Sequence, residues 1–552
     1  MIWVRDVVII AFICLLAMPI GSYIYRVLNG ERTWLTPVVQ PLECLIYRGL
    51  GYHDNQPTAM SAKTYGGAVL SISSLSFIVV FGLQLLQKWL PLNPNHVGNV
   101  KWDLAFNTAV SFVTNTNWQA YSGETTMSYL TQIIALTTQN FLSPAVGVAS
   151  LLVIMRGFKH THATTVGNFW QDIIRFILYV LMPLAFVLAI IIIACGGFQT
   201  LHANIEAGRT LIPLGPAASQ YAISLLGSNG GGFFGANGAI AFSNPNALSN
   251  FFEMVAILLV PAALVVTFGR FTEKRQARLI FTVMLIFLSL AIIGTTLAEL
   301  HTGIKFAGVT GTSVLEGKNV INGIGNSSLW TALSTAVSSG SVNANLDSFT
   351  ALGGLIPLLL IQLGEIIFGG IGSGLYGMLA FVLLTVFISG LMVGRTPEYL
   401  GKKIEPYEMK MVSLAILFPP ILSLIGTAIG VNLPHIQANL TNHGAHGFTE
   451  ILYAFASMAN NNGSAFAGFN ANQIGVNLVG GLAMAVTRFV PLIAMILMGG
   501  SLATKKLVAK GAGTLRTDTV LFGVLLIFII LLIGALNFVP ALVLGPIADF
   551  LG

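Results

Sequence analysis

The feature that most constrains this chain is a series of apolar runs, each long enough to cross a lipid bilayer. A helix needs about 20 residues to span a hydrocarbon core about 30 Å thick, and only helices and closed barrels satisfy their backbone groups there. Of the 552 residues, 55% are hydrophobic and 8% are charged, whereas soluble chains carry roughly 25% charged residues. The sequence predicts an all-α membrane protein whose ten transmembrane helices cover about residues 5–25, 64–87, 129–154, 170–195, 248–269, 279–298, 352–394, 411–430, 476–500 and 518–545.

Four short polar stretches interrupt this apolar pattern. Each follows a helix-like run too short to cross a bilayer and precedes one that is long enough. Three of them carry Gly at the third position, where the first has Thr116. Extended segments that meet at one axis can surround a dehydrated cation with backbone carbonyls, and Gly permits the backbone angles that this requires. The stretches are Thr114, Asn115, Thr116 and Asn117; Ser228, Asn229, Gly230 and Gly231; Ser338, Ser339, Gly340 and Ser341; and Asn461, Asn462, Gly463 and Ser464.

The four stretches belong to a repeated unit. Short helices are expected at about 102–113, 216–227, 328–337 and 448–459, each between two spans, so the order span, short helix, span occurs four times. Each unit crosses the bilayer twice, which gives all four the same orientation around one axis. Four outer Gly- and Asn-rich turns are the alternative, and the matching positions disfavour it. The predicted divisions are an extra helix at 1–27, repeats at 64–155, 168–270, 278–394 and 411–502, and an extra helix at 517–552.

The positive charges predict the orientation in the membrane. Cytoplasmic loops carry an excess of Lys and Arg. The four polar stretches and the N-terminus are therefore predicted to face outward, and the formal charge of +6 indicates cytoplasmic loops rather than a nucleic-acid partner. Of the 26 Lys and Arg residues, 19 lie in five loops on the side away from the polar stretches, 26–63, 156–175, 270–278, 395–410 and 505–516.

The short helices also favour a cation at the axis. A helix carries about half a negative charge at its C-terminus, so four such ends would stabilise a cation within the membrane. Polar backbone at this depth is tolerated only inside protein or beside a cavity, and there Asn, Ser and Thr side chains can hydrogen-bond to neighbouring strands. The residues alone therefore predict an ion-selective pore folded from one chain.

Four motifs carry a resemblance to a known family. They are Asn-Thr-Asn-Trp-Gln (115–119), Asn-Gly-Gly-Gly-Phe-Phe (229–234), Gly-Gly-Ile-Gly-Ser-Gly-Leu-Tyr-Gly (369–377) and Asn-Asn-Asn-Gly-Ser-Ala-Phe-Ala-Gly (460–468). Over nearly its whole length the chain resembles the superfamily of potassium transporters built from four membrane–pore–membrane repeats, and within it the A subunit of the Kdp potassium-transporting ATPase. The resemblance implies four pseudo-symmetric repeats around one K⁺ selectivity filter, made by the sixteen residues given above. The motifs place Gln119, Phe233, Asn343 and Phe466 at equivalent positions just beyond it.

The resemblance also implies a role and partners. K⁺ would be the substrate, taken up across the inner membrane of a bacterium without an organic cofactor. A P-type ATPase B subunit would hydrolyse ATP and receive K⁺ through a lateral tunnel below the filter, and a C subunit and a small single-span F subunit would complete the complex. The chain has no Asp-Lys-Thr-Gly phosphorylation motif and is expected to hold no catalytic site. A self-sufficient K⁺ channel or symporter of the same superfamily is the alternative, which a straight cytoplasmic path would favour.

The seventh span, from Leu352 to Gly394, is about twice as long as one crossing requires. Five glycines within nine residues disfavour a continuous helix in its middle. We predict a broken helix whose middle forms a loop under the filter, and in related channels such a loop is the gate. Close helix packing through small residues is the alternative. The glycines are Gly369, Gly370, Gly372, Gly374 and Gly377.

Two charged residues fall inside predicted spans, Glu365 in the seventh and Arg488 in the ninth. Intramembrane charges are costly and usually face a partner or a cavity. One hypothesis places Arg488 beside the Gly-rich loop, as a positive barrier that forces K⁺ to leave sideways. The other pairs Arg488 with Glu365 in a structural ion pair.

Several acidic residues fall on the predicted outer side. Some could concentrate K⁺ near the pore mouth, and most are expected to be ordinary solvated side chains. His443 and His446 precede the fourth short helix, and their spacing predicts loop residues rather than a metal site. The acidic residues are Asp103, Glu124, Glu206, Glu299, Glu316, Asp347 and Glu450.

Overall fold

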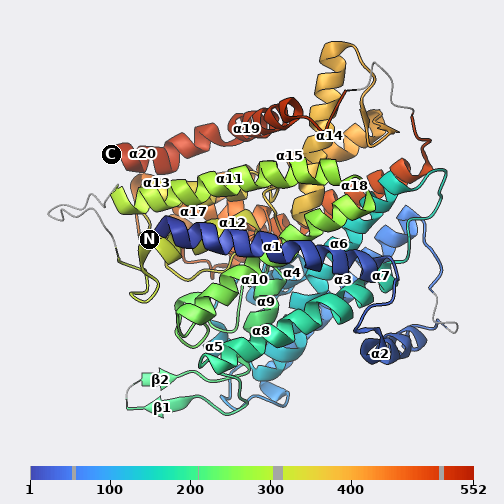
Figure 1. The fold of residues 1–552 in the computed structure, drawn as a ribbon. Helices are drawn as coiled ribbons and strands as arrows, with labels where there is room; N and C mark the ends of the chain where they lie inside the picture. The colour runs from blue at the N-terminus through green and yellow to red at the C-terminus, as the bar shows by residue number, and fades with distance from the viewer. Residues whose placement is uncertain (1, 53–56, 209, 302–314, 509–514) are drawn as a thin grey trace.

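The computed structural model describes residues 2–52, 57–208, 210–301, 315–508 and 515–552, so parts of two predicted cytoplasmic loops lie outside the described residues. Within the described ranges, ten helical spans are long and apolar enough to cross a membrane, as predicted (Figure 1). They are α1 (Ile2–Leu28); α3 (Ala62–Leu86) with η1 (Gln87–Trp89); η2 (Thr131–Thr137) with α6 (Thr138–Lys159); α7 (Phe169–Phe176) with η3 (Ile177–Leu181) and α8 (Met182–Ala194); α10 (Ala247–Phe271); α11 (Lys274–His301); α14 (Ser373–Val393); α15 (Pro406–Asn432); α18 (Ile474–Thr504); and α19 (Val520–Leu542) with η6 (Val543–Ile547) and α20 (Ala548–Leu551).

Four shorter helices lie between consecutive spans, where the sequence predicts them. Each packs against helices of its own unit and against the last helix of a neighbouring unit: α4 on α3 and α18, α9 on α8 and α6, α12 on α11 and α10, and α17 on α15 and α13. These contacts close the four units into a ring. We call the four the pore helices: α4 (Trp102–Val113), α9 (Ala217–Leu226), α12 (Gly323–Ala336) and α17 (Gly444–Ala459).

The long helices divide into inner and outer ones by burial. Helices α6 and α10 are mostly buried inside the bundle, whereas α1, α3 and α19 leave most of their apolar surface exposed. In α1 the buried residues Ile9, Ile13 and Ala17 recur every four positions and form one stripe. Gly21 continues this stripe where α1 meets α10, because an added Cβ there would lie 2.5 Å from the carbonyl oxygen of Ala263. The exposed apolar faces of the outer helices are those expected of surfaces that contact lipid.

The seventh span is broken, as predicted. Helix α13 (Ala351–Gln362) has 12 residues, too few to cross a bilayer, and α14 begins after a loop at 363–372. Several short elements were not predicted, and they connect or cap the long helices. They are α2 (Thr36–Gly49), α5 (Gly123–Thr126), α16 (Pro434–Gln437), η4 (Asn237–Ala239), η5 (Leu346–Ser348), and two antiparallel hairpins, β1 (Ile205–Ala207) with β2 (Thr210–Ile212) and β3 (Glu398–Tyr399) with β4 (Lys402–Lys403).

The ends of the bundle differ in what they carry. Figure 1 shows both chain termini and the β1–β2 hairpin at one end, and α2 at the opposite end. The hairpin immediately precedes pore helix α9, so this end is the one on which the pore helices begin.

Candidate cation-binding site

Each pore helix ends in the same turn. A residue with a positive φ follows every helix cap, which is a common way to end a helix. Asn accepts this left-handed conformation more readily than most residues other than Gly. A serine lies four residues before each of these turns, a repeat that the sequence analysis did not use: Ser111, Ser224, Ser334 and Ser457. The turn residues are Asn115 (φ 72°), Ser228 (49°), Ser338 (52°) and Asn461 (52°).

These helix ends correct the alignment of the first polar stretch. The hydroxyl of Ser111 donates a hydrogen bond to the carbonyl oxygen of Trp118 at 3.0 Å. In the third unit, Ser334 donates to the carbonyl oxygen of Ser341, also seven residues later. The first segment therefore runs over 115–118, one residue later than predicted. We call 115–118, 228–231, 338–341 and 461–464 the central segments 1 to 4.

The corrected register changes which residue takes the place of glycine in segment 1. That residue is Asn117 and not Thr116, as the sequence analysis had assumed. Asn117 has a φ of 51°, and its counterparts Gly340 and Gly463 have φ angles of 68° and 98°. The same left-handed backbone thus occurs in three of the four segments, and Asn is the residue other than Gly that best tolerates it.

The four central segments meet at one place inside the bundle. An added Cβ at Gly230 would lie 2.5 Å from the carbonyl oxygens of both Thr116 and Asn462, and 2.7 Å from Cα of Gly463. An added Cβ at Gly340 would collide with the carbonyl oxygen of Asn462 and lie 2.8 Å from Cα of Gly230. Carbonyl oxygens of different segments therefore approach one another so closely that no side chain fits between them.

Side-chain hydrogen bonds join each central segment to the next. They close a ring in the order 1, 2, 3, 4, and they confirm that Asn, Ser and Thr side chains hold neighbouring strands. The bonds run from Asn115 Nδ2 to the Ser228 carbonyl (3.0 Å), from Ser339 Oγ to the Asn229 carbonyl (3.4 Å), from Ser338 Oγ to the carbonyl of Asn460, which immediately precedes segment 4 (3.1 Å), and from Asn461 Nδ2 to Thr116 Oγ1 (2.9 Å).

The central segments are buried and not fully satisfied. All sixteen predicted residues are buried except Gly463, which is partly exposed. Among the residues that the structure describes, Asn117 Oδ1, Ser228 Oγ and Asn229 Oδ1 have no hydrogen-bond partner. Unpaired polar atoms at this depth are costly, and the C-terminal ends of four helices add partial negative charge. The arrangement is suited to a dehydrated cation.

The four residues predicted just beyond the segments all contact neighbouring elements. Gln119 and Gly232 exchange two hydrogen bonds, at 3.0 and 3.1 Å, which join segments 1 and 2. With the corrected register, Gln119 is no longer equivalent to Phe233, Asn343 and Phe466, because it lies one residue closer to the start of its segment. The other contacts are Phe466 stacked on Tyr453 (ring centroids 4.5 Å apart), Phe233 beside Tyr129 (6.1 Å) and Asn343 Nδ2 donating to Asn250 Oδ1 (3.2 Å).

The glycine-rich loop at 363–372 lies against the ends of the pore helices. The backbone N–H of Gly369 donates to the carbonyl oxygen of Ala336, the last residue of α12, at 3.1 Å. The hydroxyl of Ser338 in segment 3 donates to the Glu365 carboxylate at 3.0 Å. The predicted loop beside the central segments is therefore present, and Glu365 belongs to it.

The glycines of this loop also pack closely, so both sequence interpretations of the seventh span hold. Gly372 has a φ of 84°, and an added Cβ there would collide with the backbone of Gly147 in α6. An added Cβ at Gly369 would lie 2.8 Å from the backbone nitrogen of Gly374, and one at Gly370 would lie 2.6 Å from Ser373 Oγ. The helix is broken, and small residues hold the break against α6.

Arg488 lies beside the same loop, as the barrier hypothesis requires. It is 3% exposed, and Nη2 donates to the carbonyl oxygen of Ser143 in α6 at 3.4 Å. An added Cβ at Gly147 would collide with the carbonyl oxygen of Ile371 and lie 3.3 Å from Arg488 Nη2. The guanidinium group is thus a neighbour of the loop.

Arg488 and Glu365 share a cavity without forming an ion pair. Across the described part of the chain, every Arg–carboxylate contact within 4.0 Å involves other residues. This finding contradicts the ion-pair hypothesis. Gln362 and Asn460 also line the cavity, and each has a buried polar side-chain atom without a partner in the described residues. Such a lining suits water or an ion.

Three of the seven outer acidic residues are buried, whereas most of the seven were expected to be solvated. Asp103 accepts a hydrogen bond from Asn477 Nδ2 at 2.8 Å. Glu299 forms an ion pair with Lys318 at 2.9 Å, and neither side chain is exposed. Glu450 is also fully buried. Each of these three residues contacts a polar or charged partner inside the protein. Glu206 and Glu316 are exposed, as predicted.

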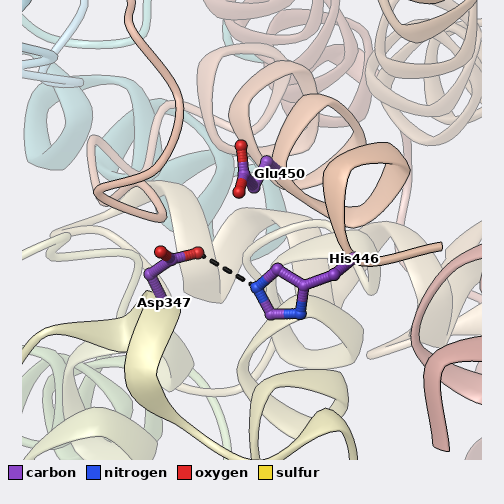
Figure 2. Close-up of side chains that lie close together, drawn as sticks. All are labelled: Asp347, His446 and Glu450. Atoms are coloured by element: carbon purple, nitrogen blue, oxygen red, sulfur yellow. Dashed lines mark hydrogen bonds and ion pairs between the residues drawn. The ribbon is translucent and has the colours of Figure 1, made fainter. Parts of the chain in front are cut away.

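The sequence predicted His446 to be a loop residue, and this prediction is wrong. His446 lies in the first turn of α17 (Figure 2). Its Nε2 is 3.1 Å from Asp347 Oδ1, and its Nδ1 is 2.9 Å from Asp549 Oδ2. Hydrogen bonds to these two carboxylates raise the pKa of His446 to about 10. Glu450 completes a group of three, whose possible ligand atoms lie within 4.8 Å of one another. The exposed His443 stays outside this group.

Comparison with known proteins bears on the whole chain. Residues 7–551 match the family described as "Potassium-transporting ATPase A subunit". A "potassium-transporting ATPase potassium-binding subunit" of Listeria welshimeri is 53% identical over 99% of this chain and 98% of the relative. A relative of the same name from Clostridium perfringens is 50% identical over 97% of this chain and 96% of the relative. The potassium transporter TrkH from Vibrio parahaemolyticus shares the fold, with a TM-score of 0.52 at 13% identity over 88% of this chain and 97% of that chain.

Proposed function

Since the chain belongs to the family of potassium-transporting ATPase A subunits, we propose that the four central segments form a K⁺ filter through which an ATP-driven pump takes up K⁺. The relatives are named as potassium-binding subunits, and the central segments are the place in this chain with the chemistry to bind such an ion. K⁺ is the substrate, and the function requires no organic cofactor in this chain.

The observation that carries this proposal is the closed ring of central segments. Glycines bring the carbonyl oxygens of Thr116 and Asn462 to within 2.5 Å of the Cβ position of Gly230. Rings of backbone carbonyls replace the hydration shell of K⁺ in selective filters. The hydrogen bonds between segments fix the size of the ring. The four segments are not equal, because Asn117 takes the place of glycine in segment 1 and Gly230 in segment 2 lacks the positive φ of its counterparts. The coordination of K⁺ is therefore asymmetric.

Below the ring, the Gly-rich loop and Arg488 control where K⁺ goes next. K⁺ arrives from outside, and the loop at 363–372 acts as the gate. The positive charge of Arg488 opposes a straight path into the cytoplasm, while the cavity lined by Glu365 and Arg488 extends between α14, α15 and α19. This sideways extension supports a lateral route to a partner subunit.

The partner supplies the chemistry of ATP hydrolysis. A potassium-binding subunit of an ATPase works with other subunits, and we assign them as a P-type ATPase B subunit, a C subunit and a single-span F subunit. The complex lies in the inner membrane of a bacterium, with the N-terminus of this chain outside. A self-sufficient channel has less support, because the relatives that cover the whole chain are named as ATPase subunits.

The test is K⁺-stimulated ATP hydrolysis by the complex that co-purifies with this chain from its own membrane. Gly230→Asp places a side chain where no Cβ fits, so it should weaken the stimulation or reduce selectivity over Na⁺. The matched control is Gly98→Asp, because Gly98 is exposed and has no atom within 4 Å of its Cβ position. If no ATPase co-purifies and the chain alone conducts K⁺ passively in liposomes, the pump is excluded and the channel is correct.

A further inference from the structure

We propose that Asp347, His446 and Glu450 form a binding site for a divalent transition-metal ion such as Zn²⁺. The site lies at the start of pore helix α17, apart from the central segments, and it goes beyond the proposed K⁺ function. Asp347 belongs to η5, and His446 and Glu450 lie one helical turn apart on α17. Imidazole nitrogen and carboxylate oxygen are both among the ligands that Zn²⁺ takes in proteins, and three protein ligands leave the fourth tetrahedral position open.

The geometry brings the three ligands to one point. Residues four apart on a helix lie on the same face, which puts His446 and Glu450 side by side. The chain returns to this face from η5, where Asp347 Oδ1 lies 3.1 Å from His446 Nε2. Figure 2 shows the three side chains around one common space. Their ligand atoms all lie within 4.8 Å of one another.

Glu450 provides a second, independent indication of a cation. Its side chain is fully buried, and Oε2 has no hydrogen-bond partner in the described residues. The other oxygen, Oε1, accepts from Asn442 Nδ2 at 2.8 Å, which fixes the carboxylate in place. A buried carboxylate oxygen without a partner is costly unless a proton or a cation satisfies it, and a metal ion in the common space would do so.

Asp549 supplies the outer partner that a metal-binding histidine usually has. A histidine that ligates a metal commonly donates its other ring N–H to a carboxylate, which orients the ring. Here Asp549 Oδ2 lies 2.9 Å from Nδ1, on the side of the ring away from Asp347. A metal ion bound between Nε2 and Asp347 Oδ1 would replace the contact that these two atoms make at 3.1 Å.

The site is connected to central segment 4 through a row of rings. The His446 ring stacks on Phe466 with centroids 5.9 Å apart, and Phe466 stacks on Tyr453 at 4.5 Å. The hydroxyl of Tyr453 is 2.8 Å from Ser464 Oγ in segment 4. A metal that fixes His446 would therefore restrain the segment, so a divalent ion outside the cell would modulate ion entry at this point.

The test is Zn²⁺ binding by the intact complex, measured in competition with a chromophoric chelator, so it does not depend on transport activity. We expect one Zn²⁺ per chain that is lost in His446→Ala and in Glu450→Gln. Asp549→Asn should weaken binding by about 10- to 100-fold, as expected for an outer partner of a ligating histidine. His443→Ala is the matched control and should bind like the unmodified chain, because His443 lies outside the group.

Co²⁺ provides a second readout, because its visible absorption reports the ligands directly. The spectrum of the intact complex should change in His446→Ala and stay unchanged in His443→Ala. If the unmodified complex does not compete with the chelator for Zn²⁺, or if His446→Ala and His443→Ala bind equally, the site does not exist and His446 acts only as an ion-pair partner. Elution of each variant as an intact complex separates loss of the site from loss of the fold.

Discussion

At the scale of single residues, the backbone of Asn117 determines the shape of central segment 1. An alanine at its φ of 51° costs about 1–2 kcal/mol, and every 1.4 kcal/mol corresponds to tenfold in affinity. We predict that Asn117→Ala raises the K⁺ concentration for half-maximal ATP hydrolysis by about tenfold, and that Asn117→Gly has the smaller effect. Both variants lose the bond from Asn117 Nδ2 to Asn140 Oδ1 at 2.6 Å, so their difference isolates the backbone. Equal effects would contradict this account.

The same residue shows where the sequence analysis was too simple. The sequence alignment treated Asn115 and Asn229 as equivalent, because each is the second residue of its polar stretch. That choice placed Thr116 opposite the glycines. The true register depends on where α4 ends and on the bond from Ser111 to Trp118. That information lies in the helix end and not in the stretch itself. The serine four residues before each turn would have given the correct register.

At the scale of elements, the glycine-rich loop depends on one close contact. Gly372 and Gly394 both have a positive φ, of 84° and 68°. An added Cβ at Gly372 would collide with the backbone of Gly147, whereas an added Cβ at Gly394 would have no neighbouring atom within 4 Å. We predict that Gly394→Ala lowers stability by about 1 kcal/mol and that Gly372→Ala costs more, since it also separates the loop from α6. The thermal unfolding midpoints of the two variants measure the difference. Equal midpoints would mean that backbone strain alone acts at Gly372.

The elements themselves were largely predictable. Spans and pore helices follow from the length of apolar runs, and five glycines in nine residues were enough to predict the broken helix. Helix α2 was missed because its residues are mixed in polarity, and its role depends on distant partners. Glu43 of α2, for example, accepts from Arg175 at 2.8 Å and from Tyr179 at 2.7 Å. No local pattern in 36–49 reveals those partners.

At the scale of the whole molecule, the sequence predicted the ring of four units but not what surrounds it. Asp347, His446 and Asp549 unite η5, α17 and α20, and the two carboxylates lie 99 and 103 residues from His446 in the chain. Glu299 and Lys318 likewise meet only in the folded protein. An acidic residue in an outer loop looks solvated until its partner is known, which is why the sequence did not indicate which of the seven are buried.

Arg488 tests the proposed path of K⁺ through the whole complex. Two like charges about 4 Å apart repel by about 4 kcal/mol at an effective dielectric constant of about 20, so a buried guanidinium group beside the loop can block a cation. We predict that Arg488→Ala retains K⁺-stimulated ATP hydrolysis but lowers the K⁺ accumulated per ATP in proteoliposomes, because K⁺ leaks straight through the chain. Arg488→Lys retains the charge and should leak less.

Arg32→Ala is the control, since Arg32 is exposed in a predicted cytoplasmic loop and should leave the ratio of K⁺ to ATP unchanged. Passive K⁺ flux without ATP separates a leak from a pump that runs slowly, because only a leak continues when hydrolysis stops. An unchanged ratio in Arg488→Ala would refute the barrier. The cavity beside Glu365 would then have to direct K⁺ sideways by its shape, since the positive charge would contribute nothing to the choice of path.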